Sequence, residues 1–491
     1  MDLINKEFSL FIIIKRIELN NIMDKNELFK IIADSSIYGN LGLFVGAGFP
    51  KAVSQIDESY YFNPLSWGEL LNRVCFYEDI LYRDILFPGL YDDLKSKNLD
   101  EALYDLQKYV KFSDMPQIAS GICRKISEKN SISYEEAVIK FKQDIAHITN
   151  QFPNKSQRDF FKPILEIIEP TWIITTNYDH IIESIIPEKG ISVKPSEVLQ
   201  NIKNKIPVYH LHGMTIDPES IIITSEDYQT LYIPHEYRMD KMTLLFKEST
   251  TLMLGYSIGD PNVKTALDWS KNIYEDYTSE HSEKIIQFAY SENPSNDIKI
   301  QGNLYILEIS NLANTLKELS DFIAEQKKDE AARIGKINML NDKLKNADDA
   351  FINDFLNNNH NLRDELYELL KTEKSNIVIE DFLELVTKKL RENQHIDNNF
   401  NGYKENLVFI IDLLKNIPFA YISPAALDII INDLDSVISY LGFNIGDAHE
   451  ATRYWIKNKG NIPADTYSFI FAEIKSKLNA GKCSFRWKDY L

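Results

Sequence analysis

Short apolar runs, each ending in a polar or glycine-containing turn, alternate with segments of helical periodicity between Leu41 and Ile309. A short continuous apolar run predicts a buried strand of a parallel sheet, because both faces of such a strand are covered. We predict strands at Leu41–Val45, Trp172–Ile174, Val208–Leu211, Ile221–Ile223, Thr251–Leu254, Lys284–Tyr290 and Leu304–Ile309, and a short piece around Ile191–Val193 precedes the third of them. Strands that alternate with helices in this way are typical of a doubly wound, Rossmann-like parallel sheet.

Helical periodicity fills the long stretch between the first two predicted strands. Ser66 with Glu69, and Ser133 with Glu136, each form a capping-box pattern ahead of apolar residues spaced three and four apart. Because the stretch is too long for one crossover helix, we predict a helical insertion at about 54–165.

The alternation of strand and helix stops near Leu316. Beyond it we predict helices at Ile379–Leu390, Leu407–Leu414, Ala425–Leu441 and Thr466–Leu478. The charged stretch Glu325–Lys345 predicts a solvated helix or a connector. We therefore expect an amino-terminal extension at 1–23, an α/β domain at 24–315 and an all-helical domain at 316–491.

The amino terminus carries an apolar run at Phe8–Ile14. This run is far shorter than the roughly 20 residues of a membrane-spanning helix, so we predict no membrane segment. Asp24 and Glu27 form a capping-box pattern at the start of the next helix, which leaves Met1 and Met23 both open as the natural start.

Composition excludes some classes of function. The chain has 44% hydrophobic and 26% charged residues, which is typical of a globular protein. Its formal net charge of −19 argues against a broad nucleic-acid surface and against binding to an anionic membrane. The three cysteines are far apart and odd in number, so we expect no disulfide framework and a cytoplasmic protein.

Candidate chemistry lies in the turns that follow four of the predicted strands. These turns are Gly46-Ala47-Gly48, Thr176-Asn177-Tyr178-Asp179, His212-Gly213, and Gly255-Tyr256-Ser257 leading to Asp260. In an open parallel sheet, ligands bind beyond the carboxyl ends of the strands, where all four turns would meet. Each turn also has an ordinary structural explanation, since Asn177 and Asp179 can satisfy a turn and Asp260 can cap a helix.

The order and spacing of the four turns resemble the sirtuin (SIR2) fold, and specifically the SIR2-like NAD-consuming proteins of bacterial antiphage defence. Ser66-Trp67 followed by Leu70-Leu71 also resembles a segment common after the glycine loop in that group. The resemblance covers about Leu41 to Ile309 and implies a SIR2 fold for the α/β domain.

The resemblance also implies roles for individual residues. Gly46-Ala47-Gly48 matches the glycine loop that holds the NAD pyrophosphate, and Gly255-Tyr256-Ser257 matches the loop on the adenosine side. Asn177 matches the asparagine required for cleavage, Asp179 the acidic residue that contacts the nicotinamide amide, and His212 the histidine next to the nicotinamide ribose. The resemblance places Thr176, Gly213 and Asp260 among the NAD-binding positions, and it gives His210 no role.

Two departures from the family pattern matter. Phe49 follows the glycine loop where sirtuins often carry a small polar residue. Sirtuin deacylases also carry a four-cysteine zinc module after the His-Gly element, whereas no cysteine lies between Cys123 and Cys483. A thiolate zinc site at the usual close spacing is therefore excluded, no metal is predicted, and the case for deacylation weakens.

The predicted function is hydrolysis of NAD+ to nicotinamide and ADP-ribose, by a triggered effector that depletes NAD in antiphage abortive infection. Asn177 would place the attacking water with its donor and acceptor, and His212 would act as a base, because imidazole titrates near neutral pH. Two alternatives stay open. One is an ADP-ribosyltransferase or zinc-free deacylase, and the other is a non-catalytic nucleotide-binding regulator of a partner protein.

The helical domain is expected to regulate the α/β domain, because an enzyme that destroys NAD must be held inactive in a healthy cell. We expect a homo-oligomer, a partner protein from the same defence system, or both. Arg391 and His395 are separated by three residues, one short of the spacing usual in the HEPN ribonuclease motif, so we give a nuclease function little weight.

Overall fold

The structure is a computed structural model. It describes residues 23–57, 59–60, 64–80, 115–200, 202–230, 237–256, 266–267, 284–295, 297–301, 304–357, 363–364, 366–367, 377–394, 401–417 and 422–490. The chain divides into two compact units, Met1–Lys328 and Asp329–Leu491. The predicted features at Phe8–Ile14, Ser257, Asp260 and His395 lie outside the described residues.

Unit 1 is organised around a sheet with eight strands among its described residues, in the order β3-β4-β2-β1-β5-β6-β8-β7. The strands are β1 (Leu41–Val45), β2 (Trp172–Thr175), β3 (Gly190–Val193), β4 (Ile206–His210), β5 (Thr250–Leu254), β6 (Ile285–Tyr290), β7 (Lys299–Gln301) and β8 (Leu304–Ile309). The central strand β1 runs parallel to both neighbours, with Leu43 opposite Ile173 of β2 and Leu252 of β5. Every residue of β1, β2, β4 and β5 is buried, which explains their continuous apolar character.

The prediction of a doubly wound, mostly parallel sheet is confirmed, with one correction at its edge. β7 pairs with β8 in the antiparallel sense, with Lys299 opposite Ile306. All three residues of β7 are exposed. Among the described strands, β7 is paired with β8 alone and its side chains are not covered by a core. Its sequence therefore carries no apolar run that would have predicted it.

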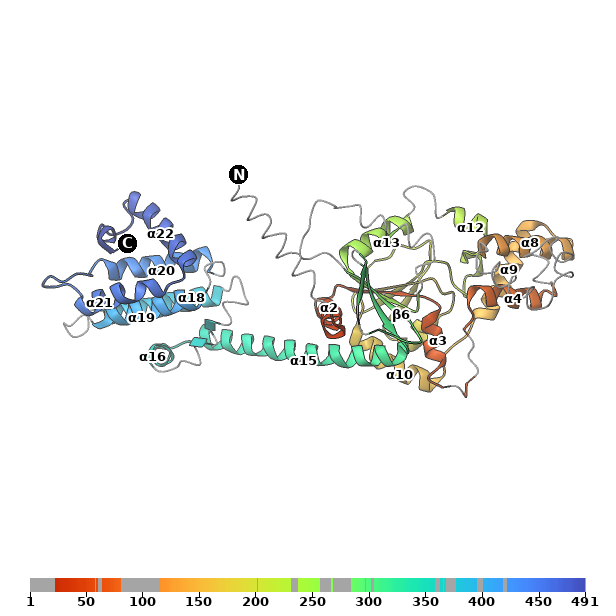
Figure 1. Cartoon of the computed structure of the whole chain (residues 1–491), viewed down its shortest axis with the longest axis horizontal. Helices are drawn as coiled ribbons and strands as arrows, with labels where there is room; N and C mark the ends of the chain where they lie inside the picture. Colours follow the sequence, from red (N-terminus) through yellow and green to blue (C-terminus); the bar gives the residue numbers. More distant parts are fainter. Residues whose placement is uncertain are drawn as a thin grey trace. The chain divides into compact units, whose positions relative to one another are not determined.

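Helices cover both faces of the sheet (Figure 1). Successive side chains of β1 alternate between the faces, so Leu43 and Val45 join one core and Phe44 joins the other. The Leu43 face is covered by α2 (Lys25–Ile37), α3 (Gly48–Ser54), α10 (Lys155–Ile168), α11 (Ile181–Ile185) and the start of α15 (Leu312–Lys345). The Phe44 face is covered by α13 (Tyr237–Glu248).

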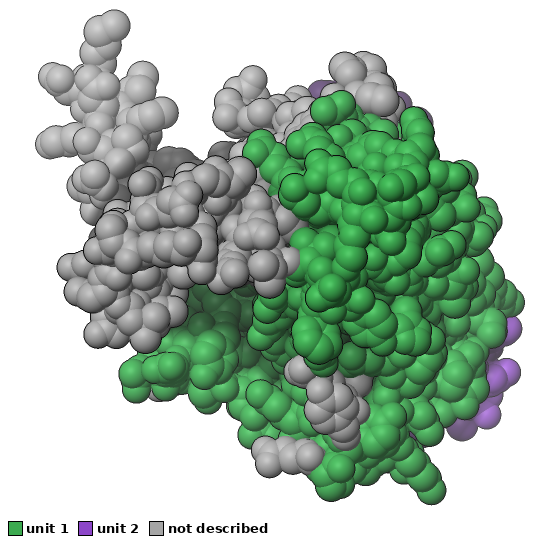
Figure 2. All heavy atoms as spheres, turned by 90° about the vertical axis from the view of Figure 1, so that its right-hand side faces the viewer, with its two compact units in different colours: residues 1–328 green, residues 329–491 purple. Residues whose placement is uncertain are grey.

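The stretch between β1 and β2 also builds a separate helical layer at one end of unit 1, which faces the viewer in Figure 2. Its helices are α4 (Trp67–Tyr77), α8 (Met115–Asn130) and α9 (Tyr134–Thr149). The capping boxes predicted at Ser66 and Ser133 are both present. These helices share a core that is distinct from the cores of the sheet, whereas α10 packs on the sheet through Phe161.

The predicted strand at Ile221–Ile223 is wrong. The segment follows a short 3-10 helix, η1 (Pro218–Ser220), and it belongs to no strand among the described residues. Its backbone contact with the sheet end is one hydrogen bond from Ile222 N to His212 O, 2.8 Å long. Ile221 and Ile223 are fully buried in the core of the helical insertion, so their apolar character reflects packing on helices.

Unit 2 is built from helices. They are the end of α15, α16 (Asp349–Asn357), α18 (Ile377–Asn393), α19 (Asn401–Asn416), α20 (Pro424–Ile438), α21 (His449–Asn458), η4 (Lys459–Asn461), α22 (Ala464–Asn479) and α23 (Trp487–Tyr490). The four helices predicted here are all present, and Trp455 and Trp487 lie in their shared core. None of the described helices combines the length and the apolar character that crossing a bilayer requires.

Candidate functional site

Four of the predicted turns follow strands that are neighbours in the sheet. The strand order β4-β2-β1-β5 places the turns after these strands side by side at the carboxyl edge. The described parts of these turns are Gly46–Gly48, Thr176–Asp179, His212–Gly213 and Gly255–Tyr256. Ligands of open parallel sheets bind at such an edge, so the structure brings together the backbone of the predicted site.

The glycine loop after β1 packs backbone to backbone against the loop after β5. Gly46 N donates to Leu254 O at 2.9 Å, and Gly48 N donates to Gly255 O at 2.8 Å. A Cβ atom on Gly48 would lie 2.6 Å from the Cα of Gly255. Gly255 itself has a positive φ of 59°, and a Cβ there would lie 2.3 Å from the backbone nitrogen of Phe49. Close approach therefore requires glycine on both loops.

The same contacts leave few free amides in the glycine loop. The N–H groups of Gly46, Gly48 and Phe49 donate to protein carbonyls, while that of Ala47 donates to none among the described residues. Ala47 is exposed and precedes the first residue of α3. Phe49, which departs from the family pattern, is buried and packs edge to face on Phe161 at 5.4 Å. Its side chain therefore belongs to the core.

Asn177 is fixed by contacts to neighbouring strands. Its backbone N–H donates to Thr175 Oγ1 at 3.1 Å, and Thr175 Oγ1 in turn donates to Val45 O of β1. Its side-chain Nδ2 donates to Gly46 O at 3.2 Å. Because a carbonyl can only accept, this contact orients the amide and leaves Oδ1 as an acceptor. The Asn177 side chain thus connects two loops and does more than satisfy its own turn.

The neighbouring Thr176 and Asp179 take more local roles. Thr176 N donates to Val45 O at 3.3 Å, and its side chain is partly exposed. Asp179 Oδ1 accepts a hydrogen bond from Ile181 N at 3.1 Å, so this carboxylate also serves the ordinary structural purpose of stabilising the start of α11. Desolvation raises the pKa of Asp179 from 3.8 to about 6, against the opposing hydrogen bond from Ile181. A carboxyl group with this pKa is charged at neutral pH and protonated in mild acid.

His212 lies in the turn after β4 and packs against Tyr228, which itself stacks on a residue of the helical insertion. Its buried ring meets Tyr228 of α12 (Ser225–Gln229) edge to face at 5.5 Å. Tyr228 in turn stacks on Trp67 of α4 at 5.9 Å. Gly213 has a φ of 88°, and a Cβ there would lie 2.3 Å from Ser220 O. The helical insertion therefore forms part of the surroundings of His212.

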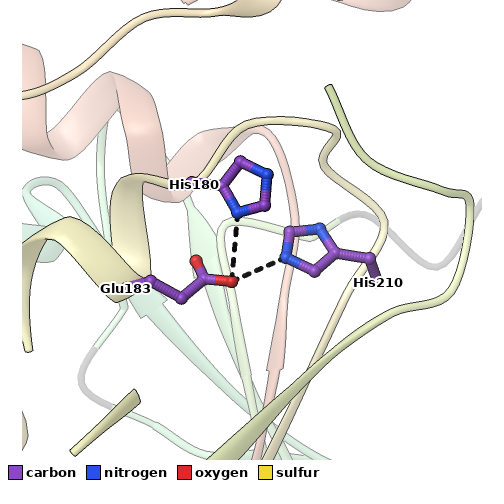
Figure 3. A group of neighbouring side chains, drawn as sticks. All are labelled: His180, Glu183 and His210. Carbon is purple, nitrogen blue, oxygen red and sulfur yellow. Dashed lines mark hydrogen bonds and ion pairs between the residues drawn. The ribbon is translucent and has the colours of Figure 1, made fainter. Parts of the chain in front are cut away.

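Sequence reasoning missed a buried group of titratable side chains beneath the Asn177 turn. Figure 3 shows His180, Glu183 and His210 pointing toward one another. The ligand-type atoms of the three lie within 4.8 Å of one another. Glu183 is the one charged residue of the short helix α11, whose other positions are mostly isoleucine. That charge on a buried helix was the available signal.

Part of unit 1 matches a known protein family. Residues 171–310 match the family model described as the SIR2-like domain, and they include β2, β4, β5 and their turns. Together with the parallel sheet and the covering helices, this match defines unit 1 as a Rossmann-like SIR2 fold.

Within that class, the chain is similar to proteins of known name. It is 29% identical over 252 residues to "NAD(+) hydrolase ThsA" of Enterococcus faecium, a match that covers 50% of this chain and 43% of that protein. It is 23% identical over 263 residues to "Defense-associated sirtuin 2" of Bacillus subtilis, covering 52% of this chain and 21% of that one. The chain therefore spans less than half the length of these relatives.

A third relative is named "NAD(+) hydrolase ThsA" and comes from Bacillus cereus (strain MSX-D12). It is 27% identical over 107 residues, which are 21% of this chain and 22% of that protein.

Proposed function

We propose that this protein is an NAD+ glycohydrolase, which cleaves NAD+ to nicotinamide and ADP-ribose. The observation that carries the proposal is the position of Asn177, whose amide is oriented by Gly46 where the turns after β1 and β2 meet. The similarity to proteins named NAD(+) hydrolase supports the choice of substrate.

The glycine loop would hold the pyrophosphate. Close packing of Gly46 and Gly48 on Gly255 fixes the loop, and the Ala47 amide is the donor that remains for a phosphate oxygen. Ser257 and Asp260 remain proposed contacts on the adenosine side, and Thr176 and Gly213 are proposed to line the ribose end.

Cleavage breaks the bond between the ribose C1′ atom and the pyridinium nitrogen, and the bonding electron pair leaves with neutral nicotinamide. The barrier lies in the oxocarbenium-like ribose, which water then attacks. Asn177 Oδ1 would accept a hydrogen bond from that water, because the bond from Nδ2 to Gly46 O fixes the orientation of the amide and leaves Oδ1 free to accept. The site thereby places the nucleophile before the bond breaks.

The other two proposed catalytic residues lie in the turns after β2 and β4. The Asp179 carboxylate would accept a hydrogen bond from the nicotinamide amide. His212 would take the proton that the attacking water loses, and the Tyr228 ring limits the directions in which the imidazole can turn. Trp67 behind Tyr228 gives the helical insertion a part in this positioning.

We further propose that the enzyme is a triggered effector that depletes NAD during antiphage abortive infection. The name "Defense-associated sirtuin 2" of one relative supports this setting. The helical part at 316–491 is proposed to keep the enzyme inactive until a signal arrives, through a homo-oligomer, a partner protein, or both.

The test measures nicotinamide released from NAD+ by the purified wild type and by Asn177→Ala and His212→Ala. We expect the two variants to lose about a hundredfold or more in turnover, the effect typical of removing one positioned polar group. Gly335→Ala serves as a control, because nothing lies within 4 Å of a Cβ at that exposed helical position. Measurable release that is equal in the wild type and both variants would sink the assignment, whereas a silent wild type would not, because the enzyme is proposed to be inactive without its signal.

Two further measurements separate this proposal from its alternatives. Isotope-labelled NAD+ that ends on protein in place of free ADP-ribose would indicate a transferase. The cellular NAD pool during phage infection tests the triggered effector, and it should fall with the wild type but stay constant with Asn177→Ala. An unchanged NAD pool in both infected cultures contradicts the effector role.

A further inference from the structure

His210, the last residue of β4, lies directly beneath the Asn177 turn and is completely buried. Its Nδ1 atom is 3.1 Å from the backbone oxygen of Asn177. Its Nε2 atom is 2.8 Å from Glu183 Oε1 (Figure 3). One imidazole ring therefore joins the turn after β2 to the helix that follows it.

Both partners of His210 are acceptors. A backbone carbonyl has no proton to give, and an ionised carboxylate has none either. The ring can satisfy both only when each nitrogen carries a proton, which makes it an imidazolium ion. A neutral ring would place a lone pair against one of the two oxygens, in a buried position where an unmade hydrogen bond is costly.

The protonation of both groups agrees with this geometry. Burial alone would lower the pKa of His210, but the hydrogen bond and the charge of Glu183 outweigh it and raise that pKa. Burial alone would raise the pKa of Glu183, but hydrogen bonds from His180 and His210 hold it well below its usual range. Among the described residues, Asp179, His180 and Glu183 are the titratable groups around the His210 ring, and Ser192 of β3 is neutral.

The alternative to an ion pair is a metal site, since two histidines and one glutamate form a zinc-type ligand set. Ligand atoms of a tetrahedral zinc site with bonds of about 2.0 Å lie about 3.3 Å apart. Glu183 Oε1 and His210 Nε2 are closer than this, and Ser192 Oγ also donates to Glu183 Oε1 at 2.6 Å. These distances are those of hydrogen bonds made directly between the side chains.

The pair matters because of what it fixes. Asn177 is held at its amide by Thr175, at its side chain by Gly46 and at its carbonyl by His210. Of these three contacts, the hydrogen bond from His210 to the Asn177 carbonyl is the one with a charged donor. It fixes the plane of the peptide bond between Asn177 and Tyr178. Loss of this donor would let that peptide rotate and move the side-chain amide of Asn177.

We propose that Glu183 and His210 form a buried ion pair whose work is to position Asn177 for the reaction. The existence of the ion pair does not depend on the proposed NAD+ cleavage, but its role in positioning Asn177 for the reaction does. Glu183 and His210 are positioning residues, since their contacts are with the turn and with each other. The proposal gives a role to His210, which the sequence pattern had left without one.

The first test compares Glu183→Gln with the wild type in the full-length protein, as kcat for nicotinamide release between about pH 6 and pH 8. Without the carboxylate, His210 loses the charge that keeps it protonated, so the variant should lose about tenfold more activity relative to wild type at the alkaline end. His180→Gln is the matched control, because its ring is 3.4 Å from Glu183 and has no hydrogen bond to Asn177. A merely structural role for Glu183 would lower activity by the same ratio at both pH values, and that result overturns the proposal.

The second test does not depend on activity. Glu183→Gln, His210→Asn and the double variant are compared by urea unfolding, and the double variant should lose clearly less stability than the two single losses added together. Additive losses overturn the ion pair, whether or not the wild type releases nicotinamide. Strong coupling, together with measurable nicotinamide release that is equal in the wild type and in Asn177→Ala, would instead leave the pair standing and reject the proposed reaction.

Metal content of the purified full-length protein completes the set. We expect no metal bound in proportion to protein. A stoichiometric ion that is lost in both Glu183→Gln and His180→Gln would overturn the ion pair and assign the three side chains to a metal site.

Discussion

The two halves of the candidate site are held together in different ways. On the β1–β5 side, glycine backbones touch directly, and a Cβ on Gly48 or Gly255 would lie under 3 Å from backbone atoms of the opposite loop. On the β2–β4 side, side chains bridge the gap, with Asn177 and His210 as the central members. One half is therefore limited by volume and the other by charge and hydrogen bonding.

This difference predicts which kinds of substitution each half tolerates. Adding one methyl group should disrupt the glycine half, although it changes no charge. An isosteric substitution that removes a charge, such as Glu183→Gln, should disrupt the side-chain half, although it changes almost no volume. The four predictions below proceed from the largest expected effect to the smallest.

Gly255→Ala should have the largest effect. A Cβ at this position would lie 2.3 Å from Phe49 N and 2.4 Å from the carbonyl carbon of Gly48, and the φ of 59° is strained for alanine. We expect a loss of about 3 kcal/mol or more in unfolding free energy, because the β1 loop must move. Urea unfolding of the full chain measures this loss.

Gly335→Ala is the control for that experiment. Gly335 lies within α15, and a Cβ there meets nothing within 4 Å. Alanine is the better helix former, so this variant should gain up to about 1 kcal/mol. If Gly255→Ala unfolds at the same urea concentration as the wild type, the backbone packing of the glycine half is wrong.

Lys142→Met tests how the insertion is attached to the side-chain half. Lys142 of α9 is buried and places its Nζ atom 2.7 Å from Asp227 Oδ1 of α12. Removing the cation leaves a partly buried carboxylate without its charge partner, at a cost of about 2 kcal/mol in unfolding free energy. Urea unfolding gives the value.

Lys125→Met provides the exposed comparison. Lys125 pairs with Glu128 at 2.8 Å, and both side chains are largely in solvent. A surface pair of this kind contributes roughly 0.5 kcal/mol or less. Equal losses in Lys142→Met and Lys125→Met would show that the buried pair does not hold the insertion in place.

Much of the fold follows from the chain because buried parallel strands leave a continuous apolar signature. Leu41–Val45 and Thr250–Leu254 are buried at every position, and both were predicted to within one residue. Lys299–Gln301 could not be predicted, because an exposed edge strand has no such signature. Ile221–Ile223 was misassigned because a run of three isoleucines does not show whether a sheet or a helical layer covers it.

The site was predictable where turns follow strands, since chain order alone places those turns at one edge. The contacts between the turns were not predictable. Nothing in Gly46-Ala47-Gly48 reveals that Gly255 packs on it, because the two are joined only by the strand order. Glu183 could have been noticed as a charge in an apolar helix, but its pairing with His210 needs the register of β2 against β4.

The pH dependence of NAD+ cleavage tests the proposed role of the Asp179 carboxylate in the turn after β2. Desolvation raises the pKa of Asp179 to about 6, so acidification from neutral pH protonates it in the folded protein well before the unfolded chain, whose value is 3.8. Folded protein binds the extra proton, so this group stabilises the fold as pH falls through that window. Activity should nevertheless drop about tenfold per pH unit below pH 6, because the carboxylate acceptor is lost.

Asp179→Asn identifies the source of that decline. The variant should be less active at neutral pH and should lose the acid limb in kcat/KM for nicotinamide release. An unchanged acid limb in Asp179→Asn assigns the titration to another group and contradicts the role of Asp179.

Tyr178→Phe should have the smallest effect, and it shows whether every hydrogen bond of the side-chain half matters equally. Tyr178 OH donates to Ile222 O at 3.0 Å, a neutral contact between the β2 turn and the segment after η1. Its removal should cost about 1 kcal/mol in unfolding free energy and change nicotinamide release less than severalfold. The charged contact of His210 with the Asn177 carbonyl would then be the one that sets the turn. A loss of activity in Tyr178→Phe as large as that in Glu183→Gln would instead mean that the turn depends on its whole hydrogen-bond network.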